Sequence, residues 1–193
     1  MSELTSSISN QIYGVISMKI IAFLGGSSLC ELGPAADVQL FFDCVQEFVV
    51  HKVPEPDWPI LTDRLYRKYL CMDELARAEI LMDQVKHVFA NVPISEIDLS
   101  GITEPTPKTW LDPKNATLAE LFSKYFENFT HCKDSTKMNY ETFKSYPGYQ
   151  YEPVRIVISN MPEFMTDKKR SLEEYEAIDG EPFWTRGNSV YSF

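Results

Sequence analysis

Basic residues are scarce in this chain of 193 residues. Its 18 Lys and Arg are outnumbered by 28 Asp and Glu, which gives a formal net charge of −10. A protein that binds nucleic acid through its phosphates presents a basic face. The composition therefore argues against direct nucleic-acid binding, and it suits a protein whose partner is itself basic.

Long apolar runs are also missing. No stretch approaches the ~20 apolar residues that cross a bilayer, so we expect no association with a membrane. Residues 1–17 are rich in serine and carry no basic segment, unlike a signal peptide. We expect these residues to form a flexible leader, followed by one domain over residues 18–193.

The four cysteines, Cys30, Cys44, Cys71 and Cys132, show no CxxC spacing. His131 and Cys132 are adjacent, but a zinc site needs four convergent ligands, and nothing supplies the other two at a recognisable spacing. We therefore expect no metal and no cofactor. Reduced, mostly buried thiols are the favoured interpretation, and they indicate the cytoplasm.

Catalytic motifs are absent as well. The run Gly25-Gly26-Ser27-Ser28 could suggest a phosphate-binding loop, but the Walker lysine and the GxGxxG spacing are missing. A serine nucleophile would need a positioned base, and the chain holds no GxSxG elbow. We expect a plain turn at these residues and a protein that is not an enzyme.

The apolar patterning predicts several helices and a few strands. Residues 20–24 and 154–158 are compact or β-branched runs that indicate strands, whereas residues 60–70 are ambiguous between strand and helix. A helix is predicted after Pro34, and another begins at the capping box of residues 117–120. A second capping box at residues 171–174 begins a short acidic helix that we expect to end at Gly180.

The clearest helical signal follows Asp73, which is a good N-cap residue. Apolar residues after it step by 3, 4, 3 and 4 positions, as one face of a helix requires, at Leu75, Ala78, Met82, Val85 and Phe89. With helices dominant, the predicted fold class is α+β, in which amphipathic helices of a single domain pack on a small, mainly antiparallel sheet.

Acidic and aromatic residues alternate near the end of the chain. Such a run is usually a solvated helix face, and paired carboxylates can also serve acid–base catalysis. Aromatic anchors with negative charge suit docking against a cationic protein. Our hypothesis assigns the binding of such a partner to Glu173, Glu174, Tyr175, Glu176, Asp179, Glu181 and Trp184.

Parts of the chain resemble immunity proteins of bacterial contact-dependent growth inhibition, a polymorphic-toxin system. The most recognisable pieces are YEPVRIVISNMP at 151–162, KRSLEEY at 169–175 and PFWTR at 182–186. The resemblance extends over residues 66–70, 74–89, 93–98, 117–129 and 151–186. It implies a cytoplasmic, non-enzymatic bacterial protein that binds and blocks a C-terminal toxin domain, often a nuclease that cleaves tRNA or other RNA.

Two other functions stay open. An acidic secretion-type chaperone or adaptor is also small and binds an extended client, whereas an immunity protein binds a folded toxin. A small hydrolase or transferase with an unseen pocket is the third possibility.

Charge reversal at Glu174 and Asp179 tests the assigned surface. If this segment meets a basic toxin, the two changes weaken toxin binding and make it less sensitive to salt, because charge attraction accelerates encounter. Binding measured across a salt series checks this expectation. If both changes are silent, the interface lies elsewhere.

Overall fold

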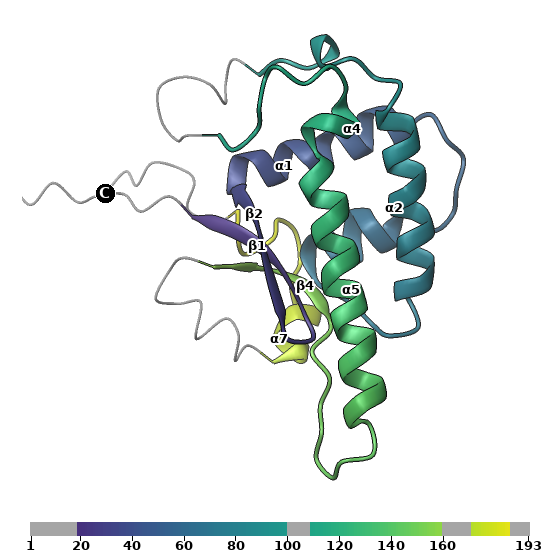
Figure 1. The fold of residues 1–193 in the computed structure, drawn as a ribbon, viewed down its shortest axis with the longest axis vertical. Coiled ribbons are helices and arrows are strands. Elements are labelled where there is room, and N and C mark those ends of the chain that lie inside the picture. The colour runs from purple at the N-terminus through teal and green to yellow at the C-terminus, as the bar shows by residue number, and fades with distance from the viewer. Residues whose placement is uncertain (1–18, 100–108, 160–170, 186–193) are drawn as a thin grey trace, which may run out of the picture.

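The computed structural model describes residues 19–99, 109–159 and 171–185. The expected leader, residues 1–17, lies outside these ranges. The described elements form one α+β domain, in which a layer of helices covers one face of a four-stranded sheet (Figure 1). The predicted fold class is therefore confirmed.

All strands of the sheet pair antiparallel, in the order β2-β1-β4-β3. The central strand β1 is buried along its whole length, as its continuous apolar run requires. The strands predicted at 20–24 and 154–158 are present, whereas β2 was not predicted. The elements are β1 (Ile20–Gly25), β2 (Ser28–Pro34), β3 (Tyr69–Leu70) and β4 (Val154–Ile158).

The helices differ widely in length and regularity. Residues 60–70 resolve into a π-helical segment followed by the short strand β3, which explains their ambiguous pattern. Within the described ranges, none of the helices combines the length and apolar character needed to cross a membrane. Their bounds are α1 (Ala35–Cys44), η1 (Val45–Val50), η2 (Ile60–Leu65), α2 (Leu75–Phe89), η3 (Ile94–Glu96), α4 (Leu118–Leu121), α5 (Ser123–Phe143) and α7 (Leu172–Glu176).

The two faces of the sheet alternate along its central strands. Phe23 of β1 and Ile156 of β4 belong to the large core under the helices. Ala22, Leu24 and Val157 form a separate buried cluster on the opposite face. Successive residues of β1 and β4 therefore point to opposite faces, and both faces of the sheet are covered.

Helix α7 packs on the face of the sheet that points away from the helical layer. Arg155 alternates with Ile156 and so points to that face, and its guanidinium carbon lies 4.8 Å from the centroid of the Tyr175 ring. The Tyr175 hydroxyl donates to the Ile156 carbonyl at 3.4 Å. This contact occupies a backbone acceptor of β4 next to the residues that pair with the two-residue strand β3.

Phe41 of α1 is the centre of the large core. Its ring stacks on Tyr125 at a centroid distance of 4.8 Å and meets Phe89, Phe122 and Phe126 edge-on at 5.2–6.0 Å. These rings come from α1, α2, α5 and the junction of α4 with α5. One aromatic cluster therefore joins the whole helical layer.

Several predicted helix ends differ from the structure. Helix α2 begins at Leu75 with Glu74 at its N-cap, so the prediction of Asp73 as the cap is wrong. The Glu74 carboxylate instead accepts a hydrogen bond from the Cys71 amide at 2.7 Å. Helix α7 ends at Glu176 rather than at Gly180. The five apolar residues predicted to line α2 are all buried.

Only one of the two hydrogen bonds of the capping box predicted at 117–120 is present. The Thr117 hydroxyl accepts from the Glu120 amide at 3.3 Å, but the Glu120 carboxylate accepts from Ala116 at 2.7 Å instead of from Thr117. The helix is also interrupted at Phe122, where α4 ends and α5 begins one residue later. The box at 171–174 is complete, as predicted.

The turn between β1 and β2 lies directly against α5. A Cβ atom on Gly25 would come within 2.6 Å of the Cys132 carbonyl oxygen, and one on Gly26 within 2.5 Å of the Ser135 carbonyl. Gly26 also has a φ of +57°, in the left-handed region. The Ser27 amide donates to the Ser135 hydroxyl at 3.1 Å. The predicted turn is present, and its glycines set how closely α5 approaches the sheet.

Replacing Gly26 with alanine tests this contact. We expect Gly26→Ala to lower the free energy of unfolding by about 2–4 kcal/mol, because backbone strain and a backbone clash add. Gly148→Ala is the matched control, since Gly148 has a φ of +77° and its Cβ would meet nothing within 4 Å. Backbone strain alone should lower the free energy of unfolding of this control by ~1 kcal/mol. Equal losses in urea unfolding of the two variants would contradict the close approach.

Candidate functional site

The structure buries both aromatic anchors of the predicted toxin-binding surface. Tyr175 is 0% exposed and Trp184 is 1% exposed. The Trp184 ring meets Tyr66 edge-on at 5.4 Å, and its indole N–H donates to the Tyr66 carbonyl at 3.2 Å. The assignment of Tyr175 and Trp184 to a docking surface is therefore wrong, because they hold the C-terminal segment onto the domain.

The carboxylates of the segment have different surroundings. Glu174 accepts from the Ser171 amide at 2.7 Å and so completes the helix cap. Hydrogen bonds from its own amide and from Ser171 lower the pKa of Glu173. Glu181 lies beside Tyr66, and burial together with that carboxylate raises the pKa of Tyr66 to about 12. Asp179 is exposed and makes no ion pair among the described residues.

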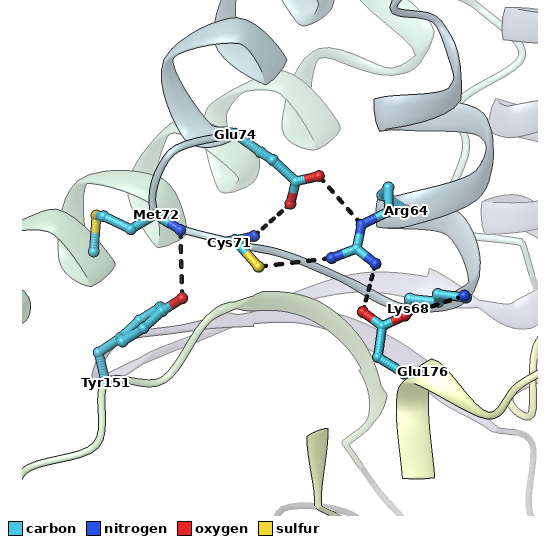
Figure 2. A network of polar contacts seen from close by, with 7 residues as sticks. All are labelled: Arg64, Lys68, Cys71, Met72, Glu74, Tyr151 and Glu176. Atoms are coloured by element: carbon cyan, nitrogen blue, oxygen red, sulfur yellow. Dashed lines mark hydrogen bonds and ion pairs between the residues drawn. The ribbon is translucent and has the colours of Figure 1, made fainter. Parts of the chain in front are cut away.

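Glu176 belongs to a network of ion pairs between α7 and the rest of the domain (Figure 2). One carboxylate oxygen accepts from Arg64 of η2, and the other accepts from Lys68 at 3.2 Å. Arg64 also donates to Glu74 at 3.2 Å and to the Cys71 sulfur at 3.6 Å. Hence η2, the start of α2 and α7 are joined through one guanidinium.

This network is a structural clamp rather than a reactive centre. The Arg64 and Glu74 side chains are 22% and 24% exposed, so much of their charge is shielded from solvent. Burial, reinforced by the Glu74 carboxylate, raises the pKa of the Cys71 thiol and disfavours the thiolate that a nucleophile needs. Arg64 lowers the pKa of Glu176, which favours the charged pair.

The adjacent residues His131 and Cys132 have different surroundings. The Cys132 sulfur donates to the Phe23 carbonyl inside the core, at 3.5 Å, while the neighbouring His131 is exposed. All four cysteines are free; Cys44 and Cys132 are buried, and Cys30 and Cys71 are half-buried. Over the three described ranges, no group of three or more His, Cys, Asp or Glu residues is placed to hold a metal ion.

A groove of about 380 Å³, not predicted from the sequence, lies between α2 and α5. Its floor is apolar, formed by the buried side chains of Met82, Phe126 and Phe129. Its rim carries four carboxylates, from Glu79, Asp83, Glu127 and Asp134. We call this feature the acidic groove. The pattern that could have predicted the acidic groove is the presence of acidic residues beside the apolar stripe of each helix. The sequence does not tell, however, which helices pack against each other.

Buried and paired charges lie at one end of the acidic groove. Lys133 is 4% exposed, and its ammonium group donates to Glu79 and lies 3.1 Å from Asp134. Burial alone would lower the pKa of Lys133, but hydrogen bonds to these two carboxylates outweigh burial and raise it. Glu79 and Asp134 are thus partly neutralised from inside the protein, whereas Asp83 and Glu127 form no ion pair among the described side chains.

A second cavity, of about 700 Å³, lies between the end of α5 and the start of α7. Three tyrosines line it, Tyr140, Tyr149 and Tyr151, and the rings of Tyr140 and Tyr151 meet edge-on at 5.8 Å. Its charged groups include both signs, because Lys144 and Arg155 are opposed by Glu152 and Glu173. The acidic groove is therefore the more strongly charged of the two hollows.

Comparison with known proteins identifies no relatives. No protein family model matches the chain, and neither a curated protein nor a solved structure shows significant similarity to it.

The pH dependence of stability tests the Glu176 ion pairs. We expect Glu176→Gln to lower the free energy of unfolding at pH 7 by about 1 kcal/mol, a modest value because the carboxylate is 40% exposed. Since the pKa of Glu176 is lower in the folded protein than its ordinary 4.5, the stabilisation is present above that value. It is lost as the pH falls through the lowered pKa.

Urea unfolding between pH 3 and pH 7 measures this difference. Asp179→Asn is the control on the same segment, and it should differ little from the natural protein at any pH. A Glu176→Gln deficit that persisted undiminished at pH 3 would show that the ion pairs are not its cause.

Proposed function

We propose that this protein binds a basic partner protein and neutralises it, acting as an immunity protein of a bacterial contact-dependent growth inhibition system. The partner is a C-terminal toxin domain, and a nuclease is the favoured kind because an enzyme that grips a polyanion is basic around its active site. The protein itself performs no catalysis, and it acts in the cytoplasm, where such a toxin meets its substrate.

The observation that carries the proposal is uncompensated negative charge at the surface. In the described ranges, many basic side chains already pair with carboxylates of the same chain: Arg64, Arg67, Lys68, Arg77, Lys133, Lys137, Lys144 and Arg155. Other carboxylates in these ranges are exposed and form no ion pair there, such as Asp83, Glu127 and Asp179, and the whole chain has a net charge of −10.

Physical chemistry links this charge to inhibition. A negative surface accelerates encounter with a basic protein at low salt and suppresses binding to acidic ones. Protection of a cell requires a dissociation constant well below the toxin concentration. We expect nanomolar binding, equivalent to about −12 kcal/mol.

One observation favours the alternative of a chaperone or adaptor that holds an extended client. Apolar side chains are exposed at the C-terminal end of α5, where the helix projects beyond the sheet (Figure 1). Met138 is 61% exposed, Phe143 40% and Tyr146 63%. An extended apolar segment could pack on such a surface. A folded basic partner would instead use the charged surfaces.

Co-expression with the protein encoded immediately upstream of this gene tests the proposal, because the proposal predicts that this neighbour is the toxin. We expect the neighbour to stop growth when expressed alone and growth to recover when this protein is present. The two proteins should co-purify as a stoichiometric complex in which the neighbour keeps its folded circular-dichroism spectrum.

Two results would decide against immunity. Co-purification with an unfolded or extended neighbour would favour the chaperone. A neighbour that is not toxic and does not bind would remove the basis for either function.

A further inference from the structure

The acidic groove combines an apolar floor with a charged rim. Its volume of about 380 Å³ is large enough to admit one long side chain. Phe126 and Met82, which form the floor, are 5% and 3% exposed, so they are fixed by packing in the core. The shape of the groove therefore does not depend on a partner.

The ring of Phe126 already attracts a cation. The ammonium group of Lys86, on α2, lies 6.0 Å from the centroid of that ring. A cation over an aromatic face is stabilised by the ring quadrupole, and Lys and Arg also lay their methylene groups on apolar surface. Lys86 therefore already takes the cation position near this ring, and the apolar floor of the acidic groove suits the methylene stem of a further basic side chain.

The charges that face the acidic groove are mostly negative. Lys86 is the one Lys or Arg among its lining residues, against the four rim carboxylates, and the remaining ionisable group is His131. The buried Lys133 forms ion pairs with Glu79 and Asp134 and so offsets part of their negative charge. Asp83 and Glu127 are left exposed on facing helices, and neither forms an ion pair among the residues described.

We infer that the acidic groove is where the basic partner docks, with a lysine or arginine side chain of that protein entering the groove and pairing with Asp83 and Glu127. The inference rests on the proposed function, since it identifies the surface that meets the toxin domain. It places the centre of the interface on α2 and α5 instead of on the C-terminal segment, whose two large aromatics are buried.

Two charge-reversal variants of equal charge compare these surfaces. Asp83→Lys with Glu127→Lys alters the acidic groove, and Glu173→Lys with Asp179→Lys alters the C-terminal segment by the same net charge. All four carboxylates are exposed, and none is placed in the core. The dissociation constant for the neighbouring toxin domain is measured for both variants at 0.15 M salt.

We expect the groove variant to bind at least ~100-fold more weakly and to fail to protect cells. In contrast to the hypothesis drawn from the sequence alone, the affinity of the C-terminal variant should change by less than about threefold, because charges remote from an interface are screened at this salt concentration. Thermal unfolding checks that each variant is folded. If the groove variant does not fold, Asp83→Asn with Glu127→Gln replaces it, with a loss of about tenfold expected.

The outcomes separate the two proposals. The docking site is overturned if only the C-terminal variant loses affinity for the toxin domain, if both variants lose it equally, or if neither does. In each of these cases the immunity function still stands. If the natural protein neither binds nor protects against the neighbour, the proposed function fails.

A second measurement tests the groove without the toxin. Hexa-arginine amide is titrated into the isotopically labelled protein, and amide NMR shifts are mapped onto the fold. We expect the largest shifts around Asp83, Phe126 and Glu127, and we expect Asp83→Lys with Glu127→Lys to abolish them. Shifts spread over all acidic surfaces, or centred elsewhere, would overturn the assignment.

Discussion

The close approach of α5 to the β1–β2 turn is the contact on which the helical layer depends. Gly25 and Gly26 leave no room for a Cβ atom against the carbonyls of Cys132 and Ser135, and the Ser27 amide fixes the register through the Ser135 hydroxyl. With that contact made, Phe23 meets Phe129 of α5 edge-on at 6.0 Å. The other side of α5 is then presented to α2, where the acidic groove forms.

Charge is distributed in two ways in this molecule. At the Arg64 network, opposite charges from distant segments are paired and join α7 to η2 and α2, so their effect is structural. On α2 and α5, Lys133 offsets part of the negative charge from inside while Asp83 and Glu127 face outward. Burial and pairing thus decide which carboxylates stabilise the fold and which are available to a partner.

The C-terminal segment shows what a sequence pattern can predict and what it cannot. Glu174, Tyr175 and Trp184 were grouped because acidic and aromatic residues alternate there, and the capping box predicted beside them is present. Exposure could not be predicted, because it depends on what the segment packs against. Tyr175 meets β4, and Trp184 meets Tyr66, more than one hundred residues earlier in the chain. Similarly, Asp37 is buried, and hydrogen bonds that its carboxylate accepts from Thr109 and Trp110, more than seventy residues later, compensate for its burial.

The sequence by itself determined the α+β class, the strands at 20–24 and 154–158, the buried stripe of α2 and the overall acidity. Each depends on the period of apolar residues, on a local cap or on composition, all of which are properties of short segments or of simple counts. Only the tertiary structure decided that α2 lies beside α5, that Glu176 is paired with Arg64 and Lys68, and that two predicted surface aromatics are buried. Those facts depend on contacts between residues far apart in the chain, which no local pattern encodes.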